Sequence, residues 1–151
     1  MKTDTKVLTE TKIELTMCAE PDYLHVARTA VRQAAQSLNI EEENIEPIAL
    51  AVEEALTNVI RHSYGGPCDK PMILKLSKIN FEDTSKTALE VLITDFGQKT
   101  DIKKIKGRDL DGVKPGGVGV HIMKTVMDEV EFTPNEDSGM TLRMIKYIDQ
   151  K

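Results

Sequence analysis

The sequence predicts an α+β fold, a two-layer sandwich in which a mixed, mostly antiparallel sheet carries its helices on one face. Two observations lead to this prediction. Segments with the two-residue apolar period of strands occur beside segments whose apolar residues recur every three or four positions, as in helices. Along the chain they follow the order strand, helix, helix, strand, strand, loop, helix, strand, strand. With 151 residues and 40% apolar composition, we expect residues 1–151 to close one core as a single domain.

The first half of the chain predicts one strand and two helices. Residues Lys6 to Met17 alternate between apolar and polar side chains, which is the pattern of a half-buried strand. Pro21-Asp22 opens a helix whose apolar stripe ends near Asn39. A second, longer helix is expected from about Glu42 to Ser63, because the run Tyr64-Gly65-Gly66-Pro67 stops it.

The second half predicts four strands and a short helix. Met72 to Phe81 and Thr87 to Thr94 form an antiparallel hairpin with a longer loop at residues 82–85. A short helix is expected to begin at Gly117 to Val118 and to run to Met127. The last two strands are expected at Glu129 to Thr133 and Met140 to Ile148.

Between Gly97 and the short helix the apolar period fails for about twenty residues, a length that is typical of a lid or a binding loop. This segment is basic. Its positive residues are Lys99, Lys103, Lys104, Lys106, Arg108 and Lys114, and its acidic residues are Asp101, Asp109 and Asp111. The pattern fits an anion-facing loop, and it also fits a solvated loop that serves solubility.

Composition argues against several classes of protein. The formal net charge of −5 disfavours a general nucleic-acid binder, which needs a basic face. No apolar stretch approaches the roughly 20 residues that cross a bilayer. The N-terminus also lacks the pattern of a secretory signal, so we expect a cytoplasmic protein without membrane contact. The two cysteines, Cys18 and Cys68, have no partners at metal-binding spacing and predict neither a zinc site nor a disulfide framework.

The second helix carries the first candidate site. Glu54 and Asn58 lie four residues apart on its polar side, where a carboxylate and a carboxamide could hold a hydrated Mg²⁺ or activate a hydroxyl. Glu53 and Thr57 form a similar pair one residue earlier, so helical geometry does not choose between the two carboxylates. A polar helix face that simply meets water is the alternative interpretation.

Two segments that contain glycine are further candidates. Asp95 follows the clearest buried strand and precedes Gly97, so its carboxylate could accept a hydrogen bond from an exocyclic amine of a ligand, or simply begin a turn. The run Gly116-Gly117-Val118-Gly119 at a helix start would let backbone N–H groups approach a phosphate, with a structural hinge as the alternative. The sequence has neither a dinucleotide-binding fingerprint nor a P-loop.

Taken in order, three segments resemble the N, G1 and G2 boxes of the Bergerat-fold ATPases, which include gyrase, a heat-shock chaperone, sensor histidine kinases and mismatch-repair ATPases. They are Glu54-Ala55-Leu56-Thr57-Asn58-Val59-Ile60-Arg61-His62, Asp95-Phe96-Gly97 and Gly116-Gly117-Val118-Gly119-Val120-His121-Ile122-Met123. The short length and the form Glu-Ala-x-Thr-Asn-x-x-x-His are most similar to the bacterial anti-sigma-factor serine/threonine kinases. The resemblance covers the chain from about Thr11 to Tyr147.

This resemblance implies ATP and Mg²⁺ as cofactors, and it implies roles for individual residues. Asn58 would bind Mg²⁺, and Glu54 would be the catalytic carboxylate. Asp95 would receive the adenine amino group beside Gly97, with Thr141 near the base. The phosphates would be held by Gly116, Gly117, Val118, Gly119 and Val120, with Lys114 as the candidate for the family's basic residue before them.

The resemblance also implies partners, namely a small STAS-domain anti-anti-sigma protein as the substrate and a sigma factor that the kinase sequesters. The family often forms dimers, and the apolar face of the first helix is available for a homodimer. Lys99 replaces the second glycine of the G1 box, and Pro115 separates Lys114 from the glycine run. These departures motivate an alternative, an ATP-gated module that sequesters a partner without kinase activity. A detached histidine-kinase catalytic domain is the third interpretation.

Overall fold

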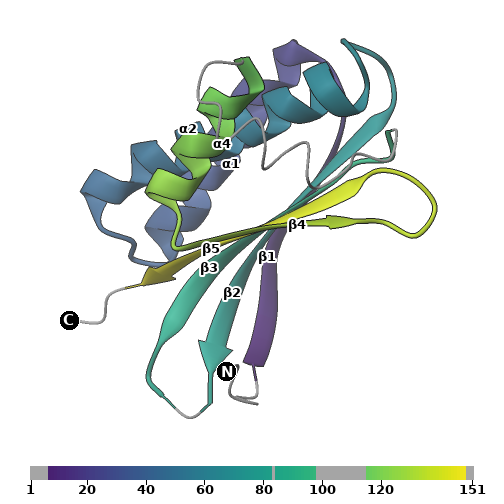
Figure 1. The fold of residues 1–151 in the computed structure, drawn as a ribbon. Coiled ribbons are helices and arrows are strands. Elements are labelled where there is room, and N and C mark those ends of the chain that lie inside the picture. The colour runs from purple at the N-terminus through teal and green to yellow at the C-terminus, as the bar shows by residue number, and fades with distance from the viewer. Residues whose placement is uncertain (1–6, 83, 98–114, 149–151) are drawn as a thin grey trace.

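The computed structural model describes residues 7–82, 84–97 and 115–148. These residues form two layers, a twisted sheet and a group of helices that covers one of its faces (Figure 1). The arrangement confirms the α+β sandwich that the sequence predicts. Side chains alternate along each strand, so one face of the sheet packs on the helices while the other face remains open.

In the described part of the chain the sheet has five strands in the order β1-β2-β3-β5-β4, and its neighbouring strands are antiparallel. The strands are β1 (Val7–Cys18), β2 (Pro71–Phe81), β3 (Thr87–Thr94), β4 (Glu129–Pro134) and β5 (Met140–Ile148). The sequence predicts a mixed, mostly antiparallel sheet. In the structure every pair of neighbouring strands among the described residues is antiparallel, so no parallel pair is found there. The reason is that β5 lies between β3 and β4 and runs opposite to both.

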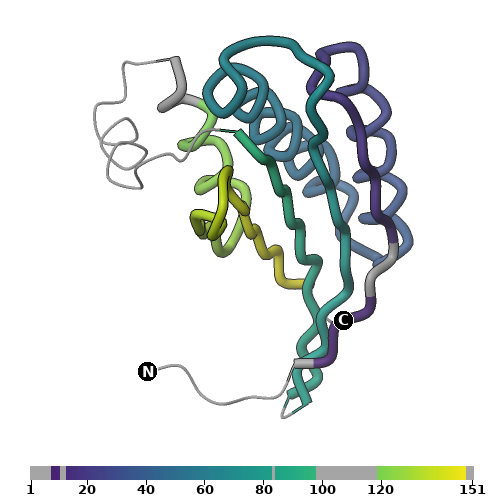
Figure 2. The backbone as a smooth tube through the Cα atoms, turned by 90° about the vertical axis from the view of Figure 1, so that its right-hand side faces the viewer, coloured from purple at the N-terminus to yellow at the C-terminus, as the bar shows by residue number. Residues whose placement is uncertain are grey.

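The helices share one face of the sheet. They are the 3-10 turn η1 (Pro21–Tyr23), α1 (Leu24–Ser37), α2 (Glu42–Asn58), the π-helical turn η2 (Val59–Ser63) and α4 (Pro115–Val126). Helix α2 lies between α1 and α4 (Figure 2). Its side chains Ile48 and Leu56 are buried in one core with Leu74, Ile93 and Met144 of the sheet. Burial of a side chain of this size contributes about 1.5–3 kcal/mol, so the core fixes α2 firmly on the sheet.

Two helix boundaries differ from the sequence prediction. The helix expected from Glu42 to Ser63 is α-helical only to Asn58, and its last turn is the π-helical η2. Val59 and Ile60 stay buried in this wider turn, so the apolar pattern gives no sign of the change. Helix α4 begins at Pro115, before the expected start at Gly117 to Val118. Proline fits the first turn of a helix, because an N–H there would have no intrahelical partner.

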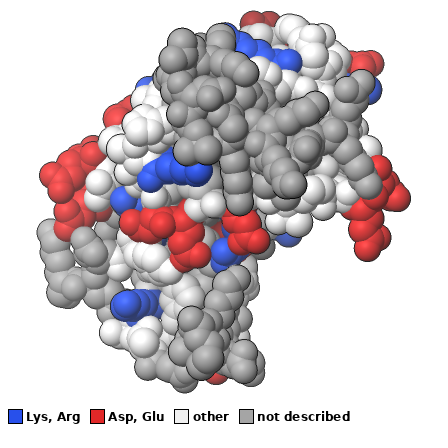
Figure 3. All heavy atoms as spheres, in the orientation of Figure 1, with Lys and Arg blue, Asp and Glu red and all other residues white. Residues whose placement is uncertain are grey.

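Charges of both signs are mixed on the surface. On the face seen in Figure 3, the described lysine and arginine side chains are interspersed with aspartate and glutamate. The described residues on this face therefore form no continuous basic surface of the kind that nucleic-acid phosphates require. Within residues 7–82, 84–97 and 115–148, no helix is both long enough and apolar enough to span a membrane.

Candidate active site

Helices α2 and α4 bring together residues that lie far apart in the sequence. Gly119 of α4 faces Glu54 and Asn58 of α2: a Cβ atom built on Gly119 would lie 3.1 Å from Glu54 Oε2 and 3.3 Å from Asn58 Nδ2. Contacts this short are tighter than an ordinary van der Waals contact, so the absence of a side chain at Gly119 lets α4 approach the two polar side chains closely. The structure therefore places Gly119 of α4 next to the polar pair of α2.

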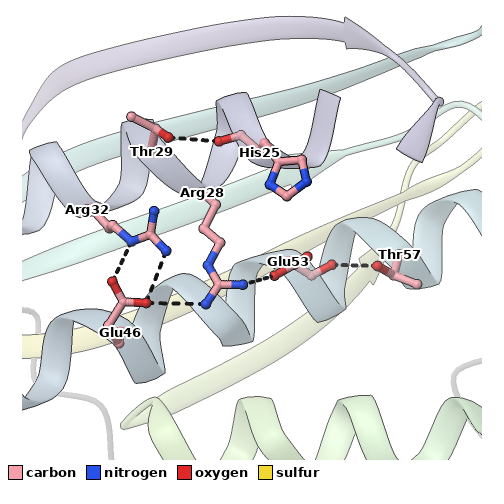
Figure 4. A network of polar contacts seen from close by, with 7 residues as sticks. All are labelled: His25, Arg28, Thr29, Arg32, Glu46, Glu53 and Thr57. Atoms are coloured by element: carbon pink, nitrogen blue, oxygen red, sulfur yellow. Dashed lines mark hydrogen bonds and ion pairs between the residues drawn. The ribbon is translucent and has the colours of Figure 1, made fainter. Parts of the chain in front are cut away.

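The carboxylate of Glu53 points toward α1, away from this meeting point (Figure 4). Arg28 Nη1 donates a hydrogen bond of 2.6 Å to Glu53 Oε2, and Arg28 Nη2 lies 3.2 Å from Glu46 Oε2. Glu46 also receives hydrogen bonds from Arg32, and these bonds hold the pKa of the Glu46 carboxyl below its ordinary value. This network joins α1 to α2, and the Glu53 carboxylate is held in it by Arg28.

The structure thus distinguishes the pair Glu54 and Asn58 from the pair Glu53 and Thr57. Helical spacing alone leaves these two pairs equivalent. The Thr57 hydroxyl donates to the backbone carbonyl of Glu53 at 2.9 Å, and the Glu53 side chain is bound by Arg28. The Glu54 carboxylate is half-buried on the α4 side, and no residue in the described part of the chain donates a hydrogen bond to it. Of the two neighbouring carboxylates, Glu54 is the one that lies beside Gly119 of α4, and Glu53 is the one that Arg28 binds.

Asp95 forms a second polar centre at the end of β3. Its side chain is buried, with only 2% of the residue exposed. The Ser63 hydroxyl donates to Asp95 Oδ2 at 3.1 Å, and the Gly97 N–H donates to Oδ1 at 3.1 Å. Burial raises the pKa of the Asp95 carboxyl, while the hydrogen bonds from Gly97 and Ser63 act in the opposite direction. The result is a buried carboxylate that is oriented by its donors.

Gly97 is required by a close approach of two backbone segments. A Cβ atom built on Gly97 would lie 2.2 Å from the carbonyl oxygen of Ser63 and 2.9 Å from Ser63 Cβ. The loop after β3 is therefore pressed against the π-helical end of α2. Gly139, which the sequence did not single out, has a related role, because its φ is +83° and its Cβ would lie 2.0 Å from the carbonyl oxygen of Asp95.

Asn135 connects Asp95 to Thr141, the residue predicted to lie near the base. Asn135 Nδ2 donates to the Asp95 carbonyl oxygen at 3.0 Å, and the Thr141 hydroxyl donates to Asn135 Oδ1 at 2.7 Å. Thr141 is also the strand partner of Thr94, directly before Asp95. The structure thus groups Asp95, Gly97 and Thr141 in one place, and it adds Asn135 and Ser63, which sequence reasoning missed.

The remaining predicted residues are only partly described. Gly116, Gly117 and Val118 belong to the first turn of α4, which begins at Pro115. Val120 is buried, and its side chain packs in the hydrophobic core, so only its backbone is available to a ligand. Lys114, Lys99 and the rest of the basic segment lie outside the described residues.

The donor set suits a phosphorylated ligand with Mg²⁺. Carboxylate and carboxamide oxygens are the protein ligands that Mg²⁺ prefers, and Glu54 and Asn58 present both types next to Gly119. Within the described residues, no cluster of three or more His, Cys, Asp or Glu side chains is present. A Mg²⁺ ion with few protein ligands usually takes its remaining ligands from phosphate oxygens and water. The buried Asp95 is a separate hydrogen-bond acceptor at the end of β3.

This fold and this set of residues define a class of ATP-binding domain. Residues 17–146 match the histidine kinase-like ATPase domain family, and the chain belongs to that family. It is similar to the serine-protein kinase RsbW of Bacillus pumilus, with 32% identity over 148 residues, which cover 92% of this chain and 87% of that protein. RsbW of Halalkalibacterium halodurans is 35% identical over 146 residues, covering 91% and 84% of the two chains. These relatives confirm the resemblance to the anti-sigma-factor kinases.

Solved structures share the fold at low sequence identity. The crystal structure of the SiaB–SiaC complex from Pseudomonas aeruginosa superposes with a TM-score of 0.61 at 12% identity, covering 90% of this chain and 89% of that one. The RsbU and RsbW domains of a Mycobacterium tuberculosis protein match with a TM-score of 0.57 at 14% identity, covering 93% of this chain and 34% of that one. At these identities the likeness concerns the fold alone.

Proposed function

We propose that this chain is an ATP-dependent protein serine/threonine kinase that acts as an anti-sigma factor. Its substrate is a STAS-type anti-anti-sigma protein, as the similarity to RsbW suggests. The observation that carries the proposal is the convergence of Glu54, Asn58 and Gly119, which places a carboxylate, a carboxamide and a helix rich in glycine side by side. Phosphoryl transfer needs positioning and charge neutralisation above all, and this arrangement can supply both.

The chemical step follows from these positions. The serine Oγ of the protein substrate attacks the γ-phosphorus of ATP, the bond from this phosphorus to the bridging oxygen breaks, and ADP leaves. Glu54 accepts the proton of the serine hydroxyl as the new P–O bond forms. Asn58 would hold Mg²⁺, which when bound neutralises phosphate charge. The first turn of α4 would direct backbone N–H groups of Gly116 to Gly119 at the phosphates.

Asp95 would recognise the base of the nucleotide. An ionised carboxylate only accepts hydrogen bonds, so Asp95 pairs with the exocyclic amine of adenine. Thr141 lies beside it through Asn135 and would contact the base. Gly97 lets the loop that carries Asp95 pack on the end of α2, the helix that also carries Glu54 and Asn58. One helix would thus align the two ends of the nucleotide.

A transfer assay tests the proposed role of Glu54. With labelled ATP and a cognate STAS protein, Glu54→Gln should lower transfer by about 10²–10⁴-fold, because the general base is lost. The matched control is Glu53→Gln, the same change one residue earlier on the α1 side, which should remain active. A fully active Glu54→Gln variant would show that the assigned role is wrong. Binding is checked separately, since MgATP at about 100 times its Kd should stabilise the fold by about 2.7 kcal/mol.

The second candidate function is an ATP-gated module that sequesters its partner without phosphorylating it. It is favoured by Lys99, which stands where the second glycine of the G1 box is usual. Tight binding of ATP and of the partner, together with no phosphate on the partner, would support this module. An acid-stable phosphoserine on the STAS protein would support the kinase and would also exclude a histidine kinase.

The proposal extends to a sigma factor as the sequestered partner, to the cytoplasm as the location, where sigma factors act, and to a homodimer. The homodimer is supported by the position of β1, which is an edge strand of the sheet formed by the described residues and borders an apolar groove of about 320 Å³. The groove is lined by Leu15, Thr16, Met17, Cys18, Tyr23 and Val26. Tyr23 and Val26 are 44% and 55% exposed, so a second copy would cover apolar surface that now meets water.

A further inference from the structure

The end of helix α2 departs from α-helical geometry at a specific place. Residues Val59–Ser63 form a π-helical turn directly after Asn58. Such turns are rare, and they occur often at functional sites because they redirect the residues that follow. Here the turn ends at Ser63, whose hydroxyl donates to Asp95 Oδ2 at 3.1 Å across 32 residues of sequence.

Ser63 contacts the loop after β3 in two ways. Its hydroxyl binds the Asp95 carboxylate, and its backbone carbonyl lies so close to Gly97 that no Cβ fits between them. The position of Ser63 relative to Asp95 is therefore set by backbone packing and not by a flexible side chain. The hydroxyl acts as a fixed donor that is already directed at Asp95 before a ligand binds.

The two donors decide what kind of group Asp95 can recognise. Gly97 N–H and the Ser63 hydroxyl occupy one lone pair on each carboxylate oxygen, and both favour the ionised form. An ionised carboxylate pairs with the N–H of a 6-aminopurine and repels the carbonyl oxygen of a 6-oxopurine. A protonated Asp95 could instead donate a hydrogen bond to that carbonyl. Burial raises the pKa of the Asp95 carboxyl, while hydrogen bonding by Gly97, Ser63 and the backbone of Met140 lowers it, so loss of the Ser63 donor shifts the balance toward the protonated form.

We propose that Ser63 is a positioning residue that makes the base pocket selective for 6-aminopurine over 6-oxopurine nucleotides, by holding Asp95 as an oriented, ionised acceptor. The proposal rests on the proposed function, since it assigns the base of the nucleotide to Asp95. It adds to that function a residue whose own side chain acts only through Asp95. Ser63 thus sets selectivity from the end of the helix that carries Glu54 and Asn58.

The test compares three variants of the full chain. Ser63→Ala removes the donor, and Ser63→Thr keeps a hydroxyl. Ser138→Ala is the matched control, because the Ser138 hydroxyl donates at 3.2 Å to the backbone carbonyl of Phe96 in the same loop and not to the carboxylate. The dissociation constants of MgATP and MgGTP are measured by calorimetry as a function of pH. The phosphate titrations are common to all variants, so differences between the variants report on the base pocket.

We expect Ser63→Ala to raise the pH midpoint below which ATP binding is lost. The free energy of a hydrogen bond to a charged group corresponds to a shift of about one pH unit in this midpoint. At a pH below the midpoints of both the wild-type protein and the variant, Ser63→Ala should therefore bind ATP about tenfold more weakly. The preference for ATP over GTP should fall by a similar factor there, because a protonated Asp95 tolerates the 6-oxo group. Ser63→Thr should restore both properties, and Ser138→Ala should match the wild-type protein.

Two results would overturn the proposal, and each differs from a failure of the proposed function. The first result is that Ser63→Ala has the same pH midpoint of ATP binding, and the same preference for ATP over GTP, as Ser138→Ala. The second is a loss of selectivity in Ser138→Ala equal to that in Ser63→Ala, which would indicate general loosening of the loop. If Ser63→Ala does not fold, Ser63→Cys provides a weak donor of similar shape, with the same expected direction. A wild-type chain that binds neither nucleotide would instead refute the proposed function.

Discussion

Replacing Gly97 by alanine adds one methyl group at the contact between the loop after β3 and the end of α2. The new Cβ would lie 2.2 Å from Ser63 O and 2.7 Å from Ser63 C, both backbone atoms. The two segments would have to separate by about 1 Å to reach an ordinary contact distance. Overpacking usually costs about 1–3 kcal/mol, and the upper end applies here because backbone on both sides resists the shift. The separation would also pull Asp95 away from the Ser63 hydroxyl.

Urea unfolding and calorimetry measure the two consequences. Gly97→Ala should lower the free energy of unfolding by about 3 kcal/mol, which corresponds to roughly 6–12 °C in Tm for a chain of this size. It should also weaken ATP binding. The control is Gly65→Ala, where φ is +72° and a Cβ meets no atom within 4 Å. It should cost only the strain of the left-handed conformation, about 1–2 kcal/mol, and leave ATP affinity intact. A Gly97→Ala variant with wild-type stability and ATP affinity would refute the close packing.

Two further predictions concern the α1 side of the molecule. Arg28→Ala removes the partner of Glu53, and because the two side chains are 29% and 24% exposed, a double-mutant cycle with Glu53→Gln should give a coupling of only about 1 kcal/mol. ATP affinity should not change, and a large loss of it would contradict the assignment of Glu53 to the helix contact. Val26→Glu places a charge in the apolar groove beside β1 and should convert a dimer to a monomer in light scattering at micromolar concentration, with ATP binding retained. A dimer that persists in this variant would exclude the groove as the interface.

Local patterns predicted which elements exist, and tertiary contacts decided how they end and pair. The alternation in Met72 to Phe81 and the stripe of the first helix reflect burial on one face, which a sequence shows directly. The π-helical end of α2 is not visible in this way, because Val59 and Ile60 stay buried in either kind of turn. The place of β5 between β3 and β4 likewise depends on how a distant segment packs on the sheet.

In the candidate site, too, the local sequence pattern identifies candidate residues, and tertiary contacts distinguish between them. Glu54 and Glu53 were equivalent by helical spacing, and the difference between them comes from Arg28, 25 residues earlier in the chain. Gly97 was expected as a turn residue, whereas in the structure it is needed for the approach of Ser63. Ser63 and Asn135 were missed because a small polar residue at a helix end or in a turn is ordinary. Only their hydrogen bonds to Asp95 distinguish them.

Helix α2 connects all parts of the site, and this has a consequence for how the site responds to change. Its middle carries Glu54 and Asn58 beside Gly119, its outer side is tied to α1 through Glu53, and its end holds the loop of Asp95 through Ser63. Because its buried face packs closely on the sheet, we expect a displacement of one end of the helix to be transmitted along it. A shift at the base pocket should therefore reach the phosphoryl end, so that variants at the end of α2 change both the affinity for ATP and the rate of transfer.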